Sequence, residues 1–252
     1  MNITFDTNVW EPLVEEEKPH LVKIKNAILD GKIQAYICEI ALDLEAIRKE
    51  KRAELFRNYE SLTTVEPLPP ENGKLGMRIS IGPNTDLHPG IHPKQRDKLL
   101  KARDLGFRVL GMTTSPETVR TTEIPDDMYV QHDDIEEFYR YAEPLAKCND
   151  FIVELGCGRA AYDQFRAQFN LVDSGGPALP AENEKKFSEA IAEWVDGEAL
   201  SAHYASGNDY FCTDDKAGNA GTGSIFHNQN RTQLEKEFGM RIISSCEAAQ
   251  LC

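Results

Sequence analysis

Short apolar runs alternate with longer amphipathic segments along most of the chain. The apolar runs have the length of strands, and they lie at residues 3–5, 33–37, 107–112, 209–213 and 240–243. The amphipathic segments are typical of helices, and they cover about residues 15–29, 40–47, 95–105, 182–206 and 229–238. Strands that alternate with helices predict a parallel sheet with helices packed on both faces.

The segment from residue 65 to 150 fits this alternation less well. Proline- and glycine-containing stretches at residues 68–73 and 86–93 have the composition of loops, and acidic residues at 126–137 precede a further predicted helix. No internal repeat is present. We therefore expect a single domain over residues 1–252, with an insertion or elaboration at about 65–150.

The charge balance narrows the functional classes. The chain has 42 Asp or Glu residues against 28 Lys or Arg residues, which gives a formal net charge of -14. A protein that coats nucleic acid without sequence preference needs a basic surface to displace counterions, so the charge balance argues against this class. An enzyme that gathers carboxylates around a cation is compatible with the balance.

The remaining composition points to a cytoplasmic protein without membrane contact. No apolar run approaches the ~20 residues that a membrane-spanning helix needs, and the N-terminus lacks the basic and apolar regions of a signal peptide. The six cysteines include no C-x-x-C pair. This spacing argues against a zinc site and favours buried free thiols in a reducing compartment.

Acidic residues follow two of the predicted strands directly. Asp6 comes after residues 3–5, and Asp214 and Asp215 come after residues 209–213. In a parallel sheet the functional crevice lies at the carboxyl ends of the strands, so these carboxylates are expected to meet there. Such a cluster is repulsive unless it binds a cation or takes up protons. Hard oxygen ligands favour Mg²⁺ or Mn²⁺, although Asp6 alone is also a suitable helix cap.

Two segments carry a resemblance to a known family. Residues 3–9, Ile-Thr-Phe-Asp-Thr-Asn-Val, resemble the first motif of the PIN-domain nucleases, a strand followed by D-T-N. Residues 198–215 look like the other half of that signature, in which an acidic residue opens an alanine-rich helix, a glycine ends it, and a strand leads to T-x-D. The resemblance covers roughly residues 1–60 and 180–252, and its two halves occur in the expected order.

The resemblance implies a three-layer α/β/α fold with a central sheet of four or five parallel strands. It also implies an acidic site for one or two divalent ions, and hydrolysis of phosphodiester bonds, usually in RNA. By position, Asp6 would be the first metal ligand and Asp215 the fourth acidic residue. Asn8 and Thr213 would help to shape the site, supported by Asp214.

The second and third acidic residues of the family pattern stay open at this stage. For the second, Glu39, Asp43 and Glu45 all lie near the helix after the second strand, and Glu45 is preferred. For the third, Glu198 fits the alanine and leucine that follow it, and Asp196 fits the distance to the helix-ending glycine; Glu198 is slightly favoured. PIN domains are often about half as long, so the resemblance does not explain the central residues.

Two other functions compete with a nuclease. A non-catalytic PIN-like module would bind RNA or a protein, and the basic residues Arg48, Lys51 and Arg52 would then hold phosphates unless they form a solvated helix face. The segment Phe-Ile-Val-Glu-Leu-Gly-Cys-Gly at 151–158 resembles the first motif of S-adenosylmethionine-dependent methyltransferases. Its third glycine is replaced by Ala160, and the segment is equally compatible with a helix interrupted by glycines.

Several properties stay open in the sequence. They are the choice between RNA and DNA, the number of metal ions, a role as a toxin, and whether the chain forms a homo-oligomer or binds a protein inhibitor. His203, within the alanine-rich helix, is expected to be structural rather than a general base.

Overall fold

A five-stranded parallel sheet forms the centre of the protein in a computed structural model. The structure describes residues 1–48, 51, 55, 61–71, 74–111, 121–169, 181–217 and 221–252. The strand order is β5-β2-β1-β6-β7, and all pairings are parallel. The strands are β1 (Asn2–Phe5), β2 (Gln34–Cys38), β5 (Arg108–Leu110), β6 (Tyr210–Cys212) and β7 (Ile242–Ile243). The predicted parallel sheet is confirmed, with five strands.

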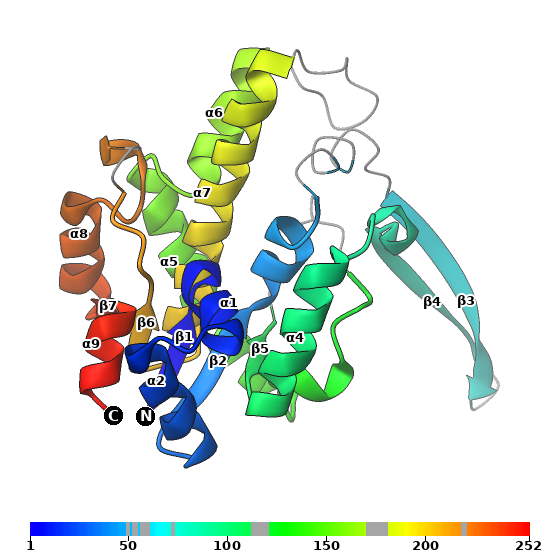
Figure 1. The fold of residues 1–252 in the computed structure, drawn as a ribbon. Coiled ribbons are helices and arrows are strands. Elements are labelled where there is room, and N and C mark those ends of the chain that lie inside the picture. Colours follow the sequence, from blue (N-terminus) through cyan, green and yellow to red (C-terminus); the bar gives the residue numbers. More distant parts are fainter. Residues whose placement is uncertain are drawn as a thin grey trace.

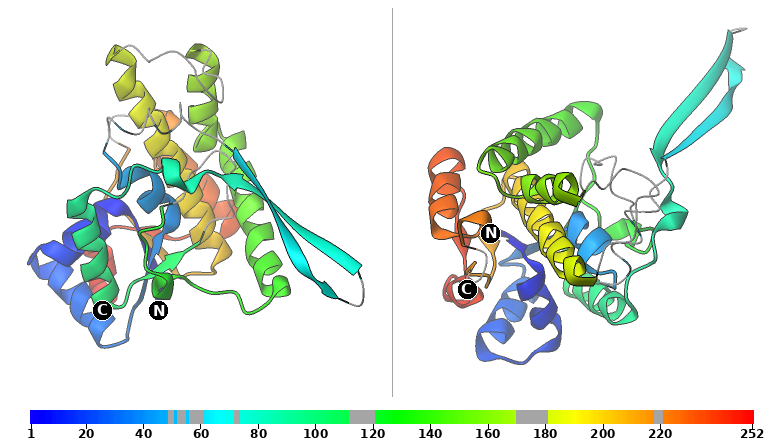
Figure 2. Two further views of the ribbon diagram at one scale, coloured as in Figure 1. Left: turned by 90° about the vertical axis from the view of Figure 1, so that its right-hand side faces the viewer. Right: turned by 90° about the horizontal axis from the view of Figure 1, so that it is seen from above.

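Helices cover both faces of the sheet, as Figures 1 and 2 show. One face carries α1 (Thr7–Glu15), α2 (Pro19–Leu29), α4 (Pro93–Leu105) and α9 (Ser245–Gln250). The other face carries α5 (Ile135–Glu154), α6 (Arg159–Phe169), α7 (Ala181–Ala205) and α8 (Asn228–Phe238). Side chains alternate across the strands, so Ile37 packs into the first core and Cys38 into the second. This arrangement is the predicted three-layer α/β/α fold.

The chain after β1 differs from the predicted single helix at 15–29. Asp6 caps a first helix, α1, which begins at Thr7 and contains Pro12. Pro19 then stands in the first turn of α2, where its missing N–H would have no helical partner. Two helices therefore replace one, and the first begins directly at the candidate site.

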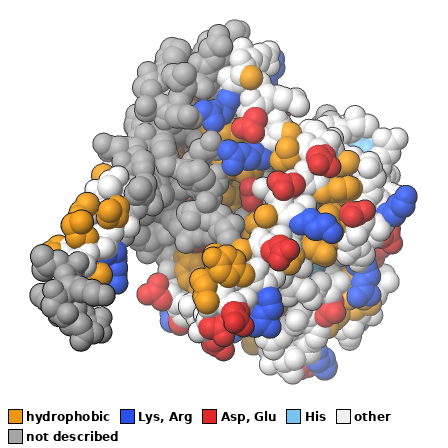
Figure 3. Space-filling model, turned by 180° about the vertical axis from the view of Figure 1, so that it is seen from behind, with side chains coloured by type: hydrophobic (Ala, Val, Ile, Leu, Met, Phe, Trp, Pro, Cys, Tyr) orange, Lys and Arg blue, Asp and Glu red, His pale blue; other side chains and the backbone are white. Residues whose placement is uncertain are grey.

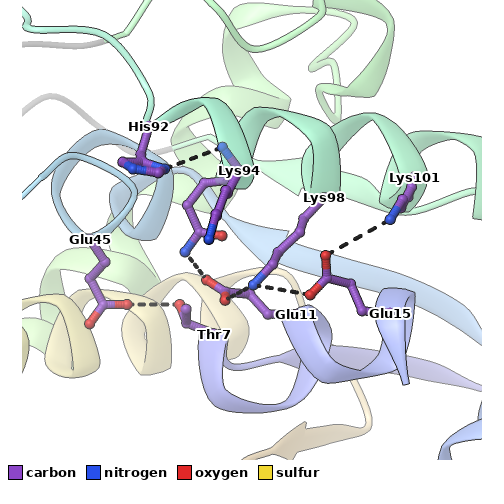
Figure 4. A network of polar contacts seen from close by, with 9 residues as sticks. Thr7, Glu11, Glu15, Glu45, His92, Lys94, Lys98 and Lys101 are labelled. Carbon is purple, nitrogen blue, oxygen red and sulfur yellow. Dashed lines mark hydrogen bonds and ion pairs between the residues drawn. The ribbon is translucent and has the colours of Figure 1, made fainter. Parts of the chain in front are cut away.

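Polar contacts hold α1 against α4, as Figure 4 shows. Lys98 Nζ lies 2.7 Å from Glu11 Oε2 and 3.5 Å from Glu15 Oε2, and Gln95 also donates to Glu11. The Lys98 and Glu11 side chains are mostly shielded from solvent, with exposed fractions of 18% and 16%. These pairs fix the orientation of the helix that follows Asp6.

The helix predicted at 40–47 is a short π-helical turn in the structure. It covers Ala41–Glu45, and Ile40, Leu44 and Ile47 are buried as the helical spacing predicted. Because a π turn widens the helix by one residue, it changes the direction in which the acids of this segment point. Such single turns occur often at functional sites.

Residues 65–150 contribute both to the body and to a projecting hairpin. Helix α4 and strand β5 belong to the central layers, whereas β3 (Ser61–Glu71) and β4 (Lys74–Pro83) form a separate antiparallel pair. Within 85–128 the structure also has the short 3-10 turns η2 (Thr85–Leu87) and η3 (Asp126–Met128). Of the loop predicted at 68–73, residues 68–71 instead belong to strand β3, and residues 72 and 73 lie outside the described residues.

The segment that resembled a methyltransferase motif does not form a strand. Residues 151–154 are the last turn of α5, and Gly156 and Gly158 connect it to α6 with positive φ angles of 77° and 61°. A Cβ atom added to Gly197 of α7 would lie 2.9 Å from the Gly158 Cα atom, so these helices approach very closely there. Gly158 permits this close packing, Gly156 supplies a positive φ angle in open space, and the strand expected by that motif is absent from this described segment.

No helix in the described part of the chain is long and apolar enough to cross a membrane.

Candidate acidic site

The site lies where β1 and β6 end side by side. Phe5 pairs with Cys212 in the parallel register, and the Asp6 N–H donates to the Cys212 carbonyl at 2.9 Å. The next residues of both strands therefore leave the sheet at the same edge. This brings Asp6 next to Thr213 and Asp215, although about 200 residues separate them along the chain.

Three groups fix the position of the Asp6 carboxylate. Asp6 Oδ1 accepts from the Thr7 N–H at 2.7 Å, and Oδ2 accepts from Asn8 Nδ2 and from the Thr213 hydroxyl, both at 2.6 Å. Asn8 Oδ1 accepts in turn from the Asp214 N–H at 2.9 Å. Burial raises the pKa of Asp6 above its usual value, and the negative charge of Asp215 adds to this rise, against the lowering effect of the hydrogen bonds.

Thr213 connects Asp6 to Asp215. Its hydroxyl donates to Asp6 and accepts from the Asp215 N–H at 3.1 Å. The Asp215 side chain is exposed and accepts from the Ala217 N–H at 2.7 Å, while the guanidinium of Arg231 donates to the Asp215 carbonyl. The predicted supporting roles of Asn8 and Thr213 agree with these contacts.

Asp196 of α7 faces the same cluster. Burial raises its pKa well above the usual value, and the charges of Asp6, Glu45, Glu193 and Asp215 raise it further. No group in the described part of the chain donates a hydrogen bond to this carboxylate. Asp196 is therefore a shielded acid surrounded by like charges.

Glu198 points to a different part of the molecule. Its Oε1 accepts from Trp194 Nε1 at 3.0 Å and from Asn149 Nδ2 at 3.3 Å, between α5 and α7. Two residues along a helix turn the side chain by about 200°, so Asp196 and Glu198 cannot share a face. Of the two predicted candidates for the third acid, Asp196 lies near the charges of the cluster, and the slightly favoured Glu198 contacts Trp194 and Asn149 instead.

Glu45 is the one of the three second-acid candidates that reaches the cluster. Its Oε2 accepts from the Thr7 hydroxyl at 2.7 Å, as Figure 4 shows, and its charge raises the pKa of Asp196. Glu39 instead accepts from the Tyr129 hydroxyl at 2.8 Å, and Asp43 accepts from the Thr121 N–H at 2.8 Å. Both alternatives anchor the segment after β5 rather than facing Asp6.

Glu193 lies beside the site but was not among the site residues predicted from the sequence. Its Oε1 accepts from the N–H groups of Ile225, at 2.7 Å, and Gly158, at 3.2 Å. Burial raises the pKa of Glu193 to about 7, and Asp215 contributes to the rise. Its spacing of three residues before Asp196 places it on the same helix face, which is the signal that could have identified it.

The other predicted residues have different surroundings. Both oxygens of Asp214 accept from Ser245, one from its N–H at 2.9 Å and one from its hydroxyl at 2.7 Å, so Asp214 anchors α9. Arg48 and Lys51 are exposed, and Arg52 lies outside the described residues. His203 is buried with a pKa lowered to about 3 by burial, and its Nδ1 lies 3.0 Å from the Thr4 hydroxyl, in agreement with a structural role.

The donor chemistry of the cluster fits a hard divalent cation. Asp6, Glu45, Asp196 and Asp215 supply only carboxylate oxygens, which Mg²⁺ and Mn²⁺ prefer. Among the described residues, no three or more His, Cys, Asp or Glu side chains form a preformed ligand set. The fit therefore rests on the donor types and on the negative charges around Asp196, and side-chain rotations would be needed to complete a coordination shell.

Comparisons with known proteins give no match: no family model, no curated protein and no solved structure matches the chain.

Proposed function

We propose that the chain is a divalent-metal-dependent nuclease with a PIN-like active site, acting on RNA at the cluster of Asp6, Glu45, Asp196 and Asp215. One observation carries the proposal: Asp196 is half-buried, it interacts with the negative charges of four other carboxylates, and it lacks a described hydrogen-bond donor. A fold keeps such an arrangement at a cost in stability, and a bound cation removes that cost. The proposal includes a cytoplasmic location, which the free state of all six cysteines fits.

The residues of the cluster have distinct tasks in this proposal. When bound, Mg²⁺ or Mn²⁺ lowers the pKa of a water molecule and stabilises negative charge on the scissile phosphate. Thr213 and Asn8 hold the Asp6 carboxylate in one orientation, and Thr7 holds Glu45. Glu193 keeps the loops at Gly158 and Ile225 in place beside Asp215.

The test is a cleavage assay with the purified chain, single-stranded RNA and, in parallel, single-stranded DNA. We expect RNA cleavage with manganese or magnesium, none in EDTA, and none for Asp6→Asn. The matched control is Asp209→Asn, because Asp209 lies at the opposite end of the same strand pair and accepts from the Asn2 N–H at 2.8 Å. Metal-independent cleavage, or equal activity of Asp6→Asn and the control, contradicts the proposal.

A non-catalytic module that binds RNA or a protein is the second candidate. The observation that favours it is the lack of a preformed ligand set among the described residues. It predicts that RNA binding, measured by fluorescence anisotropy, is equal in EDTA and in manganese and that no cleavage occurs. Retention of binding without cleavage under all metal conditions would favour this module over the nuclease.

A further inference from the structure

The hairpin of β3 and β4, here called the arm, projects from the body. Its strands pair from Ser61 with Pro83 to Leu68 with Gly76, so the ribbon is about 27 Å long at ~3.4 Å per residue. Figures 1 and 2 show that it extends away from both helical layers. An isolated two-stranded hairpin is marginally stable in water, so an arm of this length gains stability from a partner surface.

The two faces of the arm differ in polarity. Val65 pairs with Ile79 and Pro67 pairs with Met77, which puts these four side chains on one face. Val65, Met77 and Ile79 are exposed by 57%, 69% and 59%. The opposite face carries the Glu66–Arg78 ion pair, with a nitrogen–oxygen distance of 3.8 Å, and also Leu62 and Leu68, which are exposed by 42% and 39%. The face of Val65, Met77 and Ile79 is therefore the more apolar and the more exposed of the two, and it is the better suited to contact with an apolar surface.

A second uncovered apolar surface lies at the start of α5. Ile135, Phe138 and Tyr139 are exposed by 62%, 37% and 63%. Ile135 and Phe138 also border an open hollow of about 600 Å³, here called the α5 hollow. Its lining is mixed, with the apolar or aromatic residues Tyr129 and Val130 beside the polar residues Glu39, Gln131, His132 and Asp134. In Figure 2 the arm leaves the body on the side where α5 begins, and Figure 3 shows apolar side chains both on the arm and on the body at the rear.

The net charge of the arm indicates which kind of partner its apolar face can bind. Residues 61–83 contain Glu66, Glu71, Lys74 and Arg78, so the arm is neutral in a chain with a net charge of -14. A nucleic acid requires a basic surface, which this arm does not provide. The neutral arm is instead a part of the surface that can approach another acidic copy of the chain without added repulsion.

We propose that two copies of the chain form a symmetric dimer, in which the apolar face of each arm packs into the α5 hollow of the other copy. Both complementary surfaces occur on one chain, as a twofold contact requires. An arm face about 27 Å long and ~10 Å wide covers about 270 Å². Counted on the arm and on the surface that it covers, for both arms of the dimer, the buried area is roughly 1,100 Å² in total, just below the ~1,200 Å² at which stable interfaces begin. The exchange covers both apolar surfaces at once.

The test measures the mass of the full chain by sedimentation equilibrium over a range of concentrations. Ile79→Glu places a charge on the apolar arm face, and Tyr139→Glu places one beside the α5 hollow. Each is expected to raise the dimer dissociation constant at least about tenfold. The matched control is Thr64→Glu, an exposed position on the opposite face of the same ribbon, and it is expected to leave the constant within about threefold. Circular dichroism spectra check that all variants fold.

Mixing the two variants identifies the contact. A heterodimer of Ile79→Glu and Tyr139→Glu regains one unaltered arm-to-hollow contact, so the mixture should dimerise more strongly than either variant alone. Dimers that are disrupted by Ile79→Glu and not by Tyr139→Glu would show that the arms contact each other or another surface, and this would overturn the proposal. A monomeric wild-type chain at all concentrations would also overturn it. Neither outcome depends on nuclease activity.

Discussion

The acids of the candidate site differ from the other buried acids in what surrounds them. Glu39, Asp43 and Glu198 have exposed fractions of only 1%, 2% and 6%, and each accepts a hydrogen bond from a neutral donor. Asp196 has other carboxylates as its neighbours instead. Glu39, Asp43 and Glu198 are therefore fully buried, whereas Asp196 is half-buried. The sign of the neighbouring charge distinguishes a structural acid from a candidate ligand.

The largest expected difference between the two regions is in activity. Asp196→Asn removes a charged ligand and should reduce RNA cleavage by at least about a hundredfold. Glu198→Gln keeps an acceptor for Trp194 Nε1 on the same helix and should leave cleavage within about threefold. The measurement is the initial rate in manganese for both variants. Equal losses would show that α7 contributes structure alone.

The stabilisation of the fold by metal should depend on the acids of the candidate site and not on the other buried acids. A cation that binds only the folded chain at a hundredfold excess over its Kd adds about 2.7 kcal/mol, which raises Tm by roughly 5–10 °C in a domain of this size. Asp196→Asn relieves repulsion without removing a described hydrogen bond, so in EDTA it should melt higher than wild type, yet gain less from manganese. Thermal melts in both conditions measure this.

The Glu198→Gln variant is the control for these melts and should show the full manganese shift. An equal shift in Asp196→Asn would contradict the assignment of Asp196 as a ligand.

Glu193 allows a test by pH. Its folded-state pKa is raised from 4.5 to about 7, so the folded chain holds this proton more tightly than the unfolded chain does. Its contribution to stability is fully present below pH 4.5 and is lost as the pH rises to about 7. Glu193→Gln keeps the acceptor for Ile225 and Gly158 but has no charge to bury. Its advantage over wild type should grow across this window to on the order of 2 kcal/mol.

The measurement is urea unfolding of both proteins in metal-free buffer at several pH values. A constant difference between pH 4.5 and 8 would show that Glu193 titrates normally.

The smallest expected effect is at Asp214, which is adjacent to Asp215 but bonded to Ser245. Asp214→Ala should cost about 1 kcal/mol of stability, as the loss of a capping acceptor does. It should leave the manganese shift in Tm unchanged. A reduced manganese shift would instead place Asp214 among the metal ligands. Hydrogen bonding to a protein donor would then not distinguish structural acids from metal ligands at this residue.

The edge of the sheet that carries the site was predictable from the sequence. Asp6, Asn8 and Thr213 each follow an apolar strand at a fixed distance, and parallel pairing brings such strand ends together. It was harder to predict which acidic residue of α7 faces the site, although the sequence contains a pattern that indicates it. Trp194 lies four residues before Glu198, so the two share a face, and a buried tryptophan directs that face into the core.

The arm could not be predicted because its composition argues against strands. Pro67, Pro69 and Pro70 lack the N–H that a central strand must donate, and proline is tolerated only where a strand edge is free. A two-stranded ribbon has two free edges, so the prolines fit there. The helix predicted at 40–47 is likewise a π turn in the structure, because the spacing of apolar residues alone does not distinguish an α-helix from a π turn.

The pairing of β1 with β6 has a consequence for how the protein is made. Asp6 and Glu45 are synthesised early, whereas Asp196 and Asp215 emerge from the ribosome about 150 to 200 residues later. A nascent or prematurely terminated chain that ends before Asp215 therefore carries at most three of the four acids. Contacts of this sequence separation also form late in folding. The acidic cluster is thus assembled only after the residues up to Asp215 have been synthesised, which delays any chemistry at this edge of the sheet until then.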